Sequence, residues 1–119
     1  MWCALRYGWY SIACAQDSDG KLDPDTVMIR ARRKAHLQNL QKRFPEIASV
    51  EVLVTPRNDY RFRLILPKSQ WSSSILAEMA MEQDYSNFKG ETARWQGSAG
   101  TDYVRALHQV WEVMYRLQK

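Results

Sequence analysis

Arginine side chains alternate with apolar side chains in two segments of this sequence, and these segments are its strongest candidates for binding chemistry. A β-strand directs successive side chains to opposite faces, so each segment can bury one row and present guanidinium groups on the other. The planar guanidinium binds phosphate or carboxylate through two parallel hydrogen bonds. The pattern therefore predicts a positive surface for an anionic partner. Its central residues are Arg30 and Arg32 in the first segment, and Arg61 and Arg63 in the second.

The basic residues are concentrated in the middle of the chain. The 119 residues carry a formal net charge of +4, whereas residues 30–68 hold ten Lys or Arg against three acids, a local balance of +7. The remaining residues hold seven Lys or Arg against ten acids, a balance of −3. This polarity favours an acidic partner. The alternative is a solvent-exposed sheet face kept soluble by charge, with Glu51 pairing across the sheet.

Four further residues complete the candidate binding surface. Arg33 directly follows the first arginine row. The segment 84–89 mixes aromatic, amide and charged side chains without a regular period, and such loops often carry recognition. The alternative for this segment is a packed connection in which Tyr85 and Phe88 fill the edge of the core. Its candidate partner-binding residues are Tyr85, Asn87 and Lys89.

The residue pattern predicts neither catalysis nor metal binding. The only histidines are His36 and His108, and no nucleophile elbow, Cys-x-x-Cys or His-x-x-x-His pattern occurs. Residues 17–22 partly resemble a calcium loop, but the first and twelfth ligand positions lack the required carboxylates. We therefore expect a protein that is not an enzyme and that uses no cofactor and no metal. His108 lies on an apolar helical stripe and is expected at the edge of the core.

Hydrophobic periodicity predicts four strands. The first is expected over residues 2–15, with a bend or bulge at Gly8, and it forms a hairpin with a second strand. The second strand turns Val27, Ile29 and Ala31 toward the core. The third and fourth strands are expected at 49–55 and 60–66. In the fourth, Tyr60 and Phe62 alternate with the arginines, so both rings are expected to face the core rather than the arginine surface.

The same periodicity predicts helices over residues 33–44 and 69–83, and a last helix with Thr101 as its N-cap. Residues 84–100 are expected to hold one short helix and a flexible connector at 96–100. The resulting order, ββαββαα, predicts an α+β fold of two layers: a four-stranded antiparallel sheet with helices on one face. Because an antiparallel sheet needs only one covered face, the arginine rows can remain exposed.

We expect one domain over residues 1–119, because the chain suffices for one core and no linker-like stretch divides it. If Cys3 and Cys14 share one continuous strand, they lie roughly 36 Å apart, beyond disulfide reach. A sharp bend at Gly8 would bring them closer. Reduced thiols in a cytoplasmic protein are therefore the expectation.

No membrane association is expected. Arg6 interrupts the first apolar run, so the start of the chain does not have the pattern of a signal peptide. No stretch approaches 18 uninterrupted apolar residues. The final helix, in contrast, is apolar on more than one side over residues 110–117. Such a helix is either deeply buried or offers a face for self-association, so a homodimer is a further expectation.

The sequence resembles a family of small uncharacterised proteins from bacterial and phage genomes. The resemblance covers most of the chain and rests on four motifs: V-x-I-R-A-R at 27–32, D-Y-R-F-R at 59–63, D-Y-x-N-F-K at 84–89 and V-W-x-V-M-Y-R-L-Q at 110–118. The family has no assigned activity, so the resemblance implies no catalytic residue. It implies a phage or mobile-element setting, in which small proteins bind and block host defence complexes.

Two functional hypotheses follow. The first is a small non-catalytic phage or mobile-element protein that binds a host protein or ribonucleoprotein complex, for example an anti-CRISPR-like defence inhibitor. The second is a nucleic-acid-binding module that contacts phosphates through the basic sheet face. We prefer the first, because the expected arginine surface has no evident set of stacking aromatic residues. Binding that weakens steeply with salt would favour the second.

Overall fold

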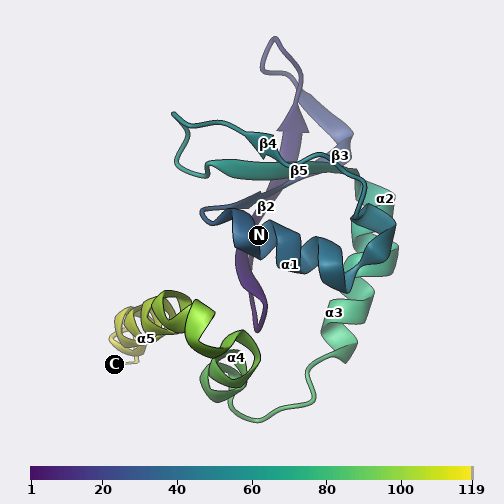
Figure 1. Ribbon diagram of the computed structural model, residues 1–119. Helices are drawn as coiled ribbons and strands as arrows, with labels where there is room; N and C mark the ends of the chain where they lie inside the picture. The colour runs from purple at the N-terminus through teal and green to yellow at the C-terminus, as the bar shows by residue number, and fades with distance from the viewer. Residues whose placement is uncertain (119) are drawn as a thin grey trace. The chain divides into compact units, whose positions relative to one another are not determined.

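The computed structural model describes residues 1–118, which form an α+β arrangement of one antiparallel sheet and several helices (Figure 1). The strands are β1 (Trp2–Leu5), β2 (Gly8–Gln16), β3 (Leu22–Ala31), β4 (Leu53–Val54) and β5 (Phe62–Pro67). The helices are α1 (Lys34–Arg43), α2 (Lys68–Gln70), α3 (Ala77–Met81), α4 (Phe88–Gln96) and α5 (Thr101–Tyr115). Two 3-10 turns, η1 (Pro45–Ile47) and η3 (Gly97–Gly100), and a π-helix, η2 (Trp71–Leu76), complete the elements.

The chain divides into two compact units. The sheet unit contains Met1–Ala4 and Gly8–Asp84, and the helical unit contains Leu5–Tyr7 together with the chain from Tyr85 onward. The expectation of a single domain stays a prediction. Within residues 1–118, no helix is long and apolar enough to cross a bilayer.

The sheet has five strands in the order β1-β2-β3-β5-β4, so the predictions of four strands and of the order ββαββαα are wrong. Residues 2–15 form two strands because the chain reverses at Arg6 and Tyr7, directly before Gly8. The backbone N–H of Ile12 consequently donates to the carbonyl of Met1 at 2.8 Å. The pairs β2–β3, β3–β5 and β4–β5 are antiparallel.

The predicted strand at 49–55 is reduced to the two residues of β4. A side chain binds the backbone that precedes it: Gln41 Nε2 donates to the carbonyls of Ile47 at 3.0 Å and Val50 at 2.7 Å. These carbonyls therefore accept from α1 and not from a neighbouring strand. Glu51 lies outside the sheet, so the expected pairing of Glu51 across the sheet is wrong.

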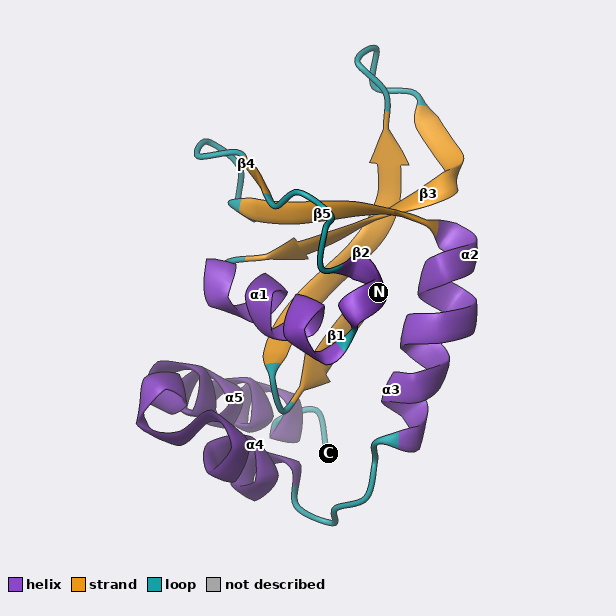
Figure 2. Cartoon of the chain, turned by 45° about the vertical axis from the view of Figure 1, so that its right-hand side comes forward, coloured by secondary structure: helices purple, strands orange, loops and turns teal. Residues whose placement is uncertain are grey.

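The core side of the sheet follows the predicted alternation. Val27, Ile29 and Ala31 of β3 are buried, and Ile29 pairs with the buried Leu64 of β5. Helix α1 begins and ends within one residue of its predicted bounds and packs Leu37 and Leu40 into this core. Burial of each large aliphatic side chain contributes about 1.5–3 kcal/mol. Figure 2 shows α1 lying across one face of the sheet, with the helical segment 68–81 beside it.

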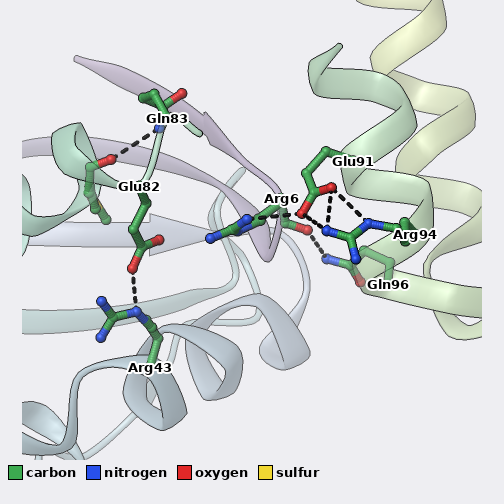
Figure 3. A network of polar contacts seen from close by, with 8 residues as sticks. Arg6, Arg43, Glu82, Gln83, Glu91, Arg94 and Gln96 are labelled. Carbon is green, nitrogen blue, oxygen red and sulfur yellow. Dashed lines mark hydrogen bonds and ion pairs between the residues drawn. The ribbon is translucent and has the colours of Figure 1, made fainter. Parts of the chain in front are cut away.

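The helix predicted over 69–83 is observed as a continuous segment over 68–81 that changes its winding. Its buried residues Trp71, Ile75 and Met79 are four positions apart, and the wider π-helical turn of η2 keeps such residues on one side. The guanidinium of Arg43 joins α1 to this segment by an ion pair with Glu78 at 3.3 Å. It also donates a hydrogen bond to Glu82 (Figure 3).

In the helical unit, the connector predicted at 96–100 joins α4 to α5 and contains the 3-10 turn η3; its flexibility stays a prediction. Asn87 is the N-cap of α4, and its side chain accepts from the backbone N–H of Gly90 at 3.0 Å. The N-cap of α5 is Gly100, so the prediction that Thr101 is this N-cap is wrong. The Thr101 hydroxyl instead donates to the carbonyl of Ser98 at 2.9 Å.

A buried tyrosine joins the two chain segments of the helical unit. The hydroxyl of Tyr103 on α5 donates to the carbonyl of Leu5 at 2.9 Å, and burial raises the pKa of Tyr103 above its ordinary range. Leu107, one turn further, is also buried. His108 is exposed, so its predicted place at the core edge is wrong, because the buried part of α5 ends at Leu107.

A polar cluster holds Leu5–Tyr7 against α4 (Figure 3). Glu91 accepts from Arg94 at 2.8 and 2.9 Å and from Arg6 Nη1 at 2.9 Å. The hydrogen bonds from Arg94, followed by those from Arg6, lower the pKa of Glu91. Gln96 Nε2 donates to the Arg6 carbonyl at 2.9 Å, which ties the backbone of the turn to the end of α4.

Candidate functional site

Arg30 and Arg63 are directly paired across the sheet on β3 and β5. Ser11 of β2 is opposite Arg30, and Leu53 of β4 is opposite Arg63, so one row crosses four strands. Directly opposed side chains lie on one face with their Cβ atoms about 4.5–5.5 Å apart. The core residues of β3 and β5 occupy the other face, where α1 packs. We call the row's side of the sheet the arginine face.

The two guanidinium groups have only neutral partners among the described residues. Arg30 donates from Nη2 to Ser11 Oγ at 2.7 Å. Arg63 donates to Met28 Sδ at 3.4 Å and to the carbonyl of Tyr60 at 3.3 Å. The Nε atoms of both arginines are buried and make no hydrogen bond within residues 1–118. Two like charges are thus opposed without a carboxylate, an arrangement that lowers stability unless an anion binds.

The ring of Tyr60 lies between two arginines. The guanidinium carbons of Arg30 and Arg32 are each 4.9 Å from its centroid. Tyr60 is buried, as predicted, but the prediction that it points away from the arginine face is wrong, because β5 begins only at Phe62 and its alternation does not extend to Tyr60. Cation–π contacts hold the guanidinium groups in place without neutralising them. Arg32 also pairs with Asp59 at 3.5 Å, but both side chains are 69% exposed, so this ion pair is weak.

Two tryptophans lie on the same face of the sheet. Trp9 is two residues from Ser11 on β2, so both side chains point to one side. The ring of Trp2 on β1 is 5.8 Å from that of Trp9, and Trp2 is 70% exposed. The sequence prediction missed this pair because its face depends on the register of β1, β2 and β3. The alternation of Trp9, Ser11 and Ala13 was the available signal.

Three of the predicted arginines lie together on the arginine face, and the other two lie apart from them. Arg30, Arg32 and Arg63 meet around Tyr60. Arg61 is exposed and lies 5.8 Å from the ring of Phe62, just before β5. Arg33 is exposed at the N-cap of α1.

Tyr85, Asn87 and Lys89 belong to the helical unit, where each has a structural contact. Arg6 lies 5.8 Å from the ring of Tyr85, Asn87 caps α4, and Lys89 Nζ is 4.4 Å from the ring centroid of Trp111. These contacts resemble the alternative of a packed connection. A partner-binding role for these three residues stays a prediction.

His36 is buried beside the arginine-bearing strands and serves the fold. Its Nδ1 accepts from the backbone N–H of Trp9 at 3.3 Å, and its carbonyl accepts from the Tyr10 hydroxyl at 2.7 Å. Burial, followed by the charge of Arg33, lowers the pKa of His36 to about 4. The imidazole is therefore neutral at pH 7.

Metal-ligating side chains are not grouped in the part of the chain described. No three His, Cys, Asp or Glu residues within residues 1–118 are placed to hold an ion. In the calcium-like loop, Asp17 Oδ1 accepts from the backbone N–H groups of Asp19 and Lys21, both at 2.9 Å, so this carboxylate closes a turn. Cys3 and Cys14 are free and half-buried, and burial raises the pKa of Cys3.

Comparison of the chain with protein-family models, curated proteins and solved structures finds no match. The resemblance to a bacterial and phage family, and the setting that it implies, stay predictions. The arginine face is therefore interpreted from its own geometry.

Proposed function

We propose that the protein is a non-catalytic binding protein whose arginine face binds single-stranded nucleic acid. The observation that carries this proposal is the opposed, uncompensated pair of Arg30 and Arg63. A phosphodiester offers two anionic oxygens, and a guanidinium can donate to both from its Nε and one Nη. A small outward rotation of either half-exposed arginine would turn its unbonded Nε toward such a phosphate.

The tryptophans favour nucleic acid over an acidic protein surface. Proteins that bind single strands combine a basic surface that follows the backbone with aromatic rings that stack on bases. Trp2 and Trp9 are an aromatic pair beside the arginines on one open sheet face. The preference for a host protein partner depended on the absence of such rings, so that preference is reversed. A phage or host-defence setting, including an anti-CRISPR-like role, stays a prediction.

The direct test is fluorescence anisotropy with labelled single-stranded DNA and RNA of about 20 nucleotides over a range of salt concentrations. Each phosphate contact contributes a slope of about −0.7 in log K against log salt for single strands. We expect the double variant Arg30→Gln/Arg63→Gln to lower the magnitude of the slope by about 1.4 and to weaken binding at least tenfold. The matched control is Arg105→Gln, because Arg105 is an exposed arginine of the helical unit. This variant should change the salt slope and the affinity less than the double variant does.

Two results would contradict the proposal. One is the absence of binding at about 20 mM salt, where phosphate contacts are strongest. The other is equal competition by polyglutamate at matched charge, which would assign the face to an acidic protein partner. A duplex competitor that is weaker than a single strand would support the stacking role of the tryptophans.

A further inference from the structure

The second half of α5 carries an apolar face that is exposed to solvent. Buried Tyr103 and Leu107 begin a stripe that continues, three or four residues at a time, through the later turns of the helix. The stripe is therefore covered in the first half of α5 and uncovered in the second. The exposed apolar residues, each 40–70% exposed, are Val110, Trp111, Val113, Met114 and Tyr115, together with Leu117 in the turn that follows α5.

The aromatic part of this face is already ordered. The rings of Trp111 and Tyr115 stack with centroids 5.1 Å apart and an interplanar angle of 19°. Lys89 Nζ lies 4.4 Å from the Trp111 centroid, within the same unit. Side chains that are held in one arrangement before association lose less entropy when they dock.

The size of the face matches half of a stable dimer. The six side chains leave on the order of 600 Å² uncovered, because each is 40–70% exposed and a whole large aromatic side chain accounts for about 150–250 Å². Patches of this size are at the upper limit for a monomer surface. Two copies would bury roughly 1,200 Å² in total, the lower bound of specific protein interfaces.

The charge pattern selects an apolar occupant. The charged residues of α5 are Asp102, Arg105 and Glu112, and all three lie away from Met114 when successive residues advance by about 100°. The stripe itself contains no charged residue of α5, and the ammonium of Lys89 beside it is already in contact with the Trp111 ring. A second copy brings a surface of the same size and the same predominantly apolar character.

We propose that a second copy of this chain docks on the exposed stripe of α5. The two helices pack antiparallel around a two-fold axis near Met114, so each copy uses the same surface. The ridge of Val110 and Met114 then enters a groove of the partner helix, and Leu117 lies in the turn just beyond it. The inference stands independently of nucleic-acid binding, because it uses residues of the helical unit alone.

Sedimentation equilibrium and light scattering at about 10–200 µM test the proposal. We expect a mass of twice the 14.0 kDa of one chain for the wild type. Met114→Glu places two like charges at the axis and should weaken association at least about tenfold. Gln109→Glu introduces the same side chain on the opposite side of α5 and should leave the mass unchanged.

A wild type that stays monomeric at about 200 µM would overturn the proposal, as would equal masses for Met114→Glu and Gln109→Glu. Hydrogen exchange on the wild type gives a second readout. Protection of the amides of residues 110–117 that increases with protein concentration supports the dimer. Protection that is independent of concentration would show that no association occurs, and that result also overturns the proposal.

Discussion

Arg30 and Arg63 are directly opposed on antiparallel strands, and no carboxylate among the described residues pairs with either of them. Opposed like charges cost stability, and a protein tolerates such a cost where the charges serve binding. The opposed pair thus lowers stability while it offers the charges that the proposed binding requires, and substitutions can separate the two effects.

Removal of one arginine of this pair should stabilise the fold. We expect Arg63→Leu to raise the free energy of unfolding by about 0.5–1 kcal/mol at low salt, because the repulsion disappears while the strand keeps an apolar side chain. The gain should shrink at high salt, where the repulsion is screened. Urea unfolding at low and high salt measures both effects. Arg57→Leu is the control, since Arg57 is exposed in the turn that precedes β5, and a salt-independent loss of stability in Arg63→Leu would contradict the interpretation.

The exposed tryptophan should contribute to binding more than to folding. We expect Trp2→Ala to weaken single-strand binding by about 1–3 kcal/mol, the range for one base stacked on an aromatic ring. Because Trp2 is 70% exposed, the melting temperature should change little. Anisotropy and thermal unfolding measure the two quantities. Met81→Ala removes another exposed apolar side chain of the sheet unit and should leave binding intact. Equal affinities for the two variants would exclude stacking on Trp2.

Protonation of His36 should destabilise the protein as the pH falls. Burial, then the charge of Arg33, lowers the pKa of His36 to about 4 in the folded state, whereas an unfolded histidine titrates near 6.5. The unfolded state therefore binds the proton first, and stability is lost between about pH 6.5 and pH 4, by up to about 3 kcal/mol. The measurement is urea unfolding across this range.

The variant His36→Gln should flatten this part of the stability profile, because it removes the titrating group. His108→Gln is the matched control, since His108 is exposed and should leave the slope unchanged. Parallel profiles for the wild type and His36→Gln between pH 6.5 and pH 4 would show that His36 is not the group responsible.

Two glycines of the helical unit should respond to alanine in opposite directions. A Cβ at Gly100 would lie 2.1 Å from the Cβ of Gln96, so Gly100→Ala must displace the end of α4 and should destabilise the protein by about 1–3 kcal/mol. A Cβ at Gly90 meets Asn87 at an ordinary 3.4 Å. Gly90→Ala within α4 should therefore stabilise by about 0.5–1 kcal/mol. Thermal unfolding that shows the same sign for both variants would contradict this assignment.

The core side of the sheet could be predicted from sequence because its signal is local. The period of two over Val27, Ile29 and Ala31 indicates which side chains of this strand are buried, and this indication does not depend on which strand pairs with it. The face on which Tyr60 lies could not be predicted in this way. The prediction extended the alternation of β5 to Tyr60, but Tyr60 lies outside this strand.

The site itself depends on relationships that a single strand does not contain. The opposition of Arg30 and Arg63 requires that β3 pairs with β5 in one register, and that pairing joins residues far apart in the chain. The tryptophan pair likewise requires the reversal at Arg6 and Tyr7, which divides one apolar run into two strands. Arg30 and Arg63 were predicted correctly as strand residues, whereas Arg32 and Arg61 lie one residue outside β3 and β5, and the aromatic side chains beside the rows were not predicted.

The reversal at Leu5–Tyr7 also has a consequence for how this chain is made. These three residues belong to the helical unit although they precede the sheet unit in sequence. The hydrogen bond from Tyr103 to Leu5 closes a loop of 98 residues, so it can form only after nearly all of the chain has left the ribosome. A C-terminal fragment that starts at Tyr85 would lack the carbonyl partner of Tyr103 and the Arg6 partner of Glu91. The helical unit is thus an assembly of the two ends of the chain, and it cannot be expressed as a contiguous piece.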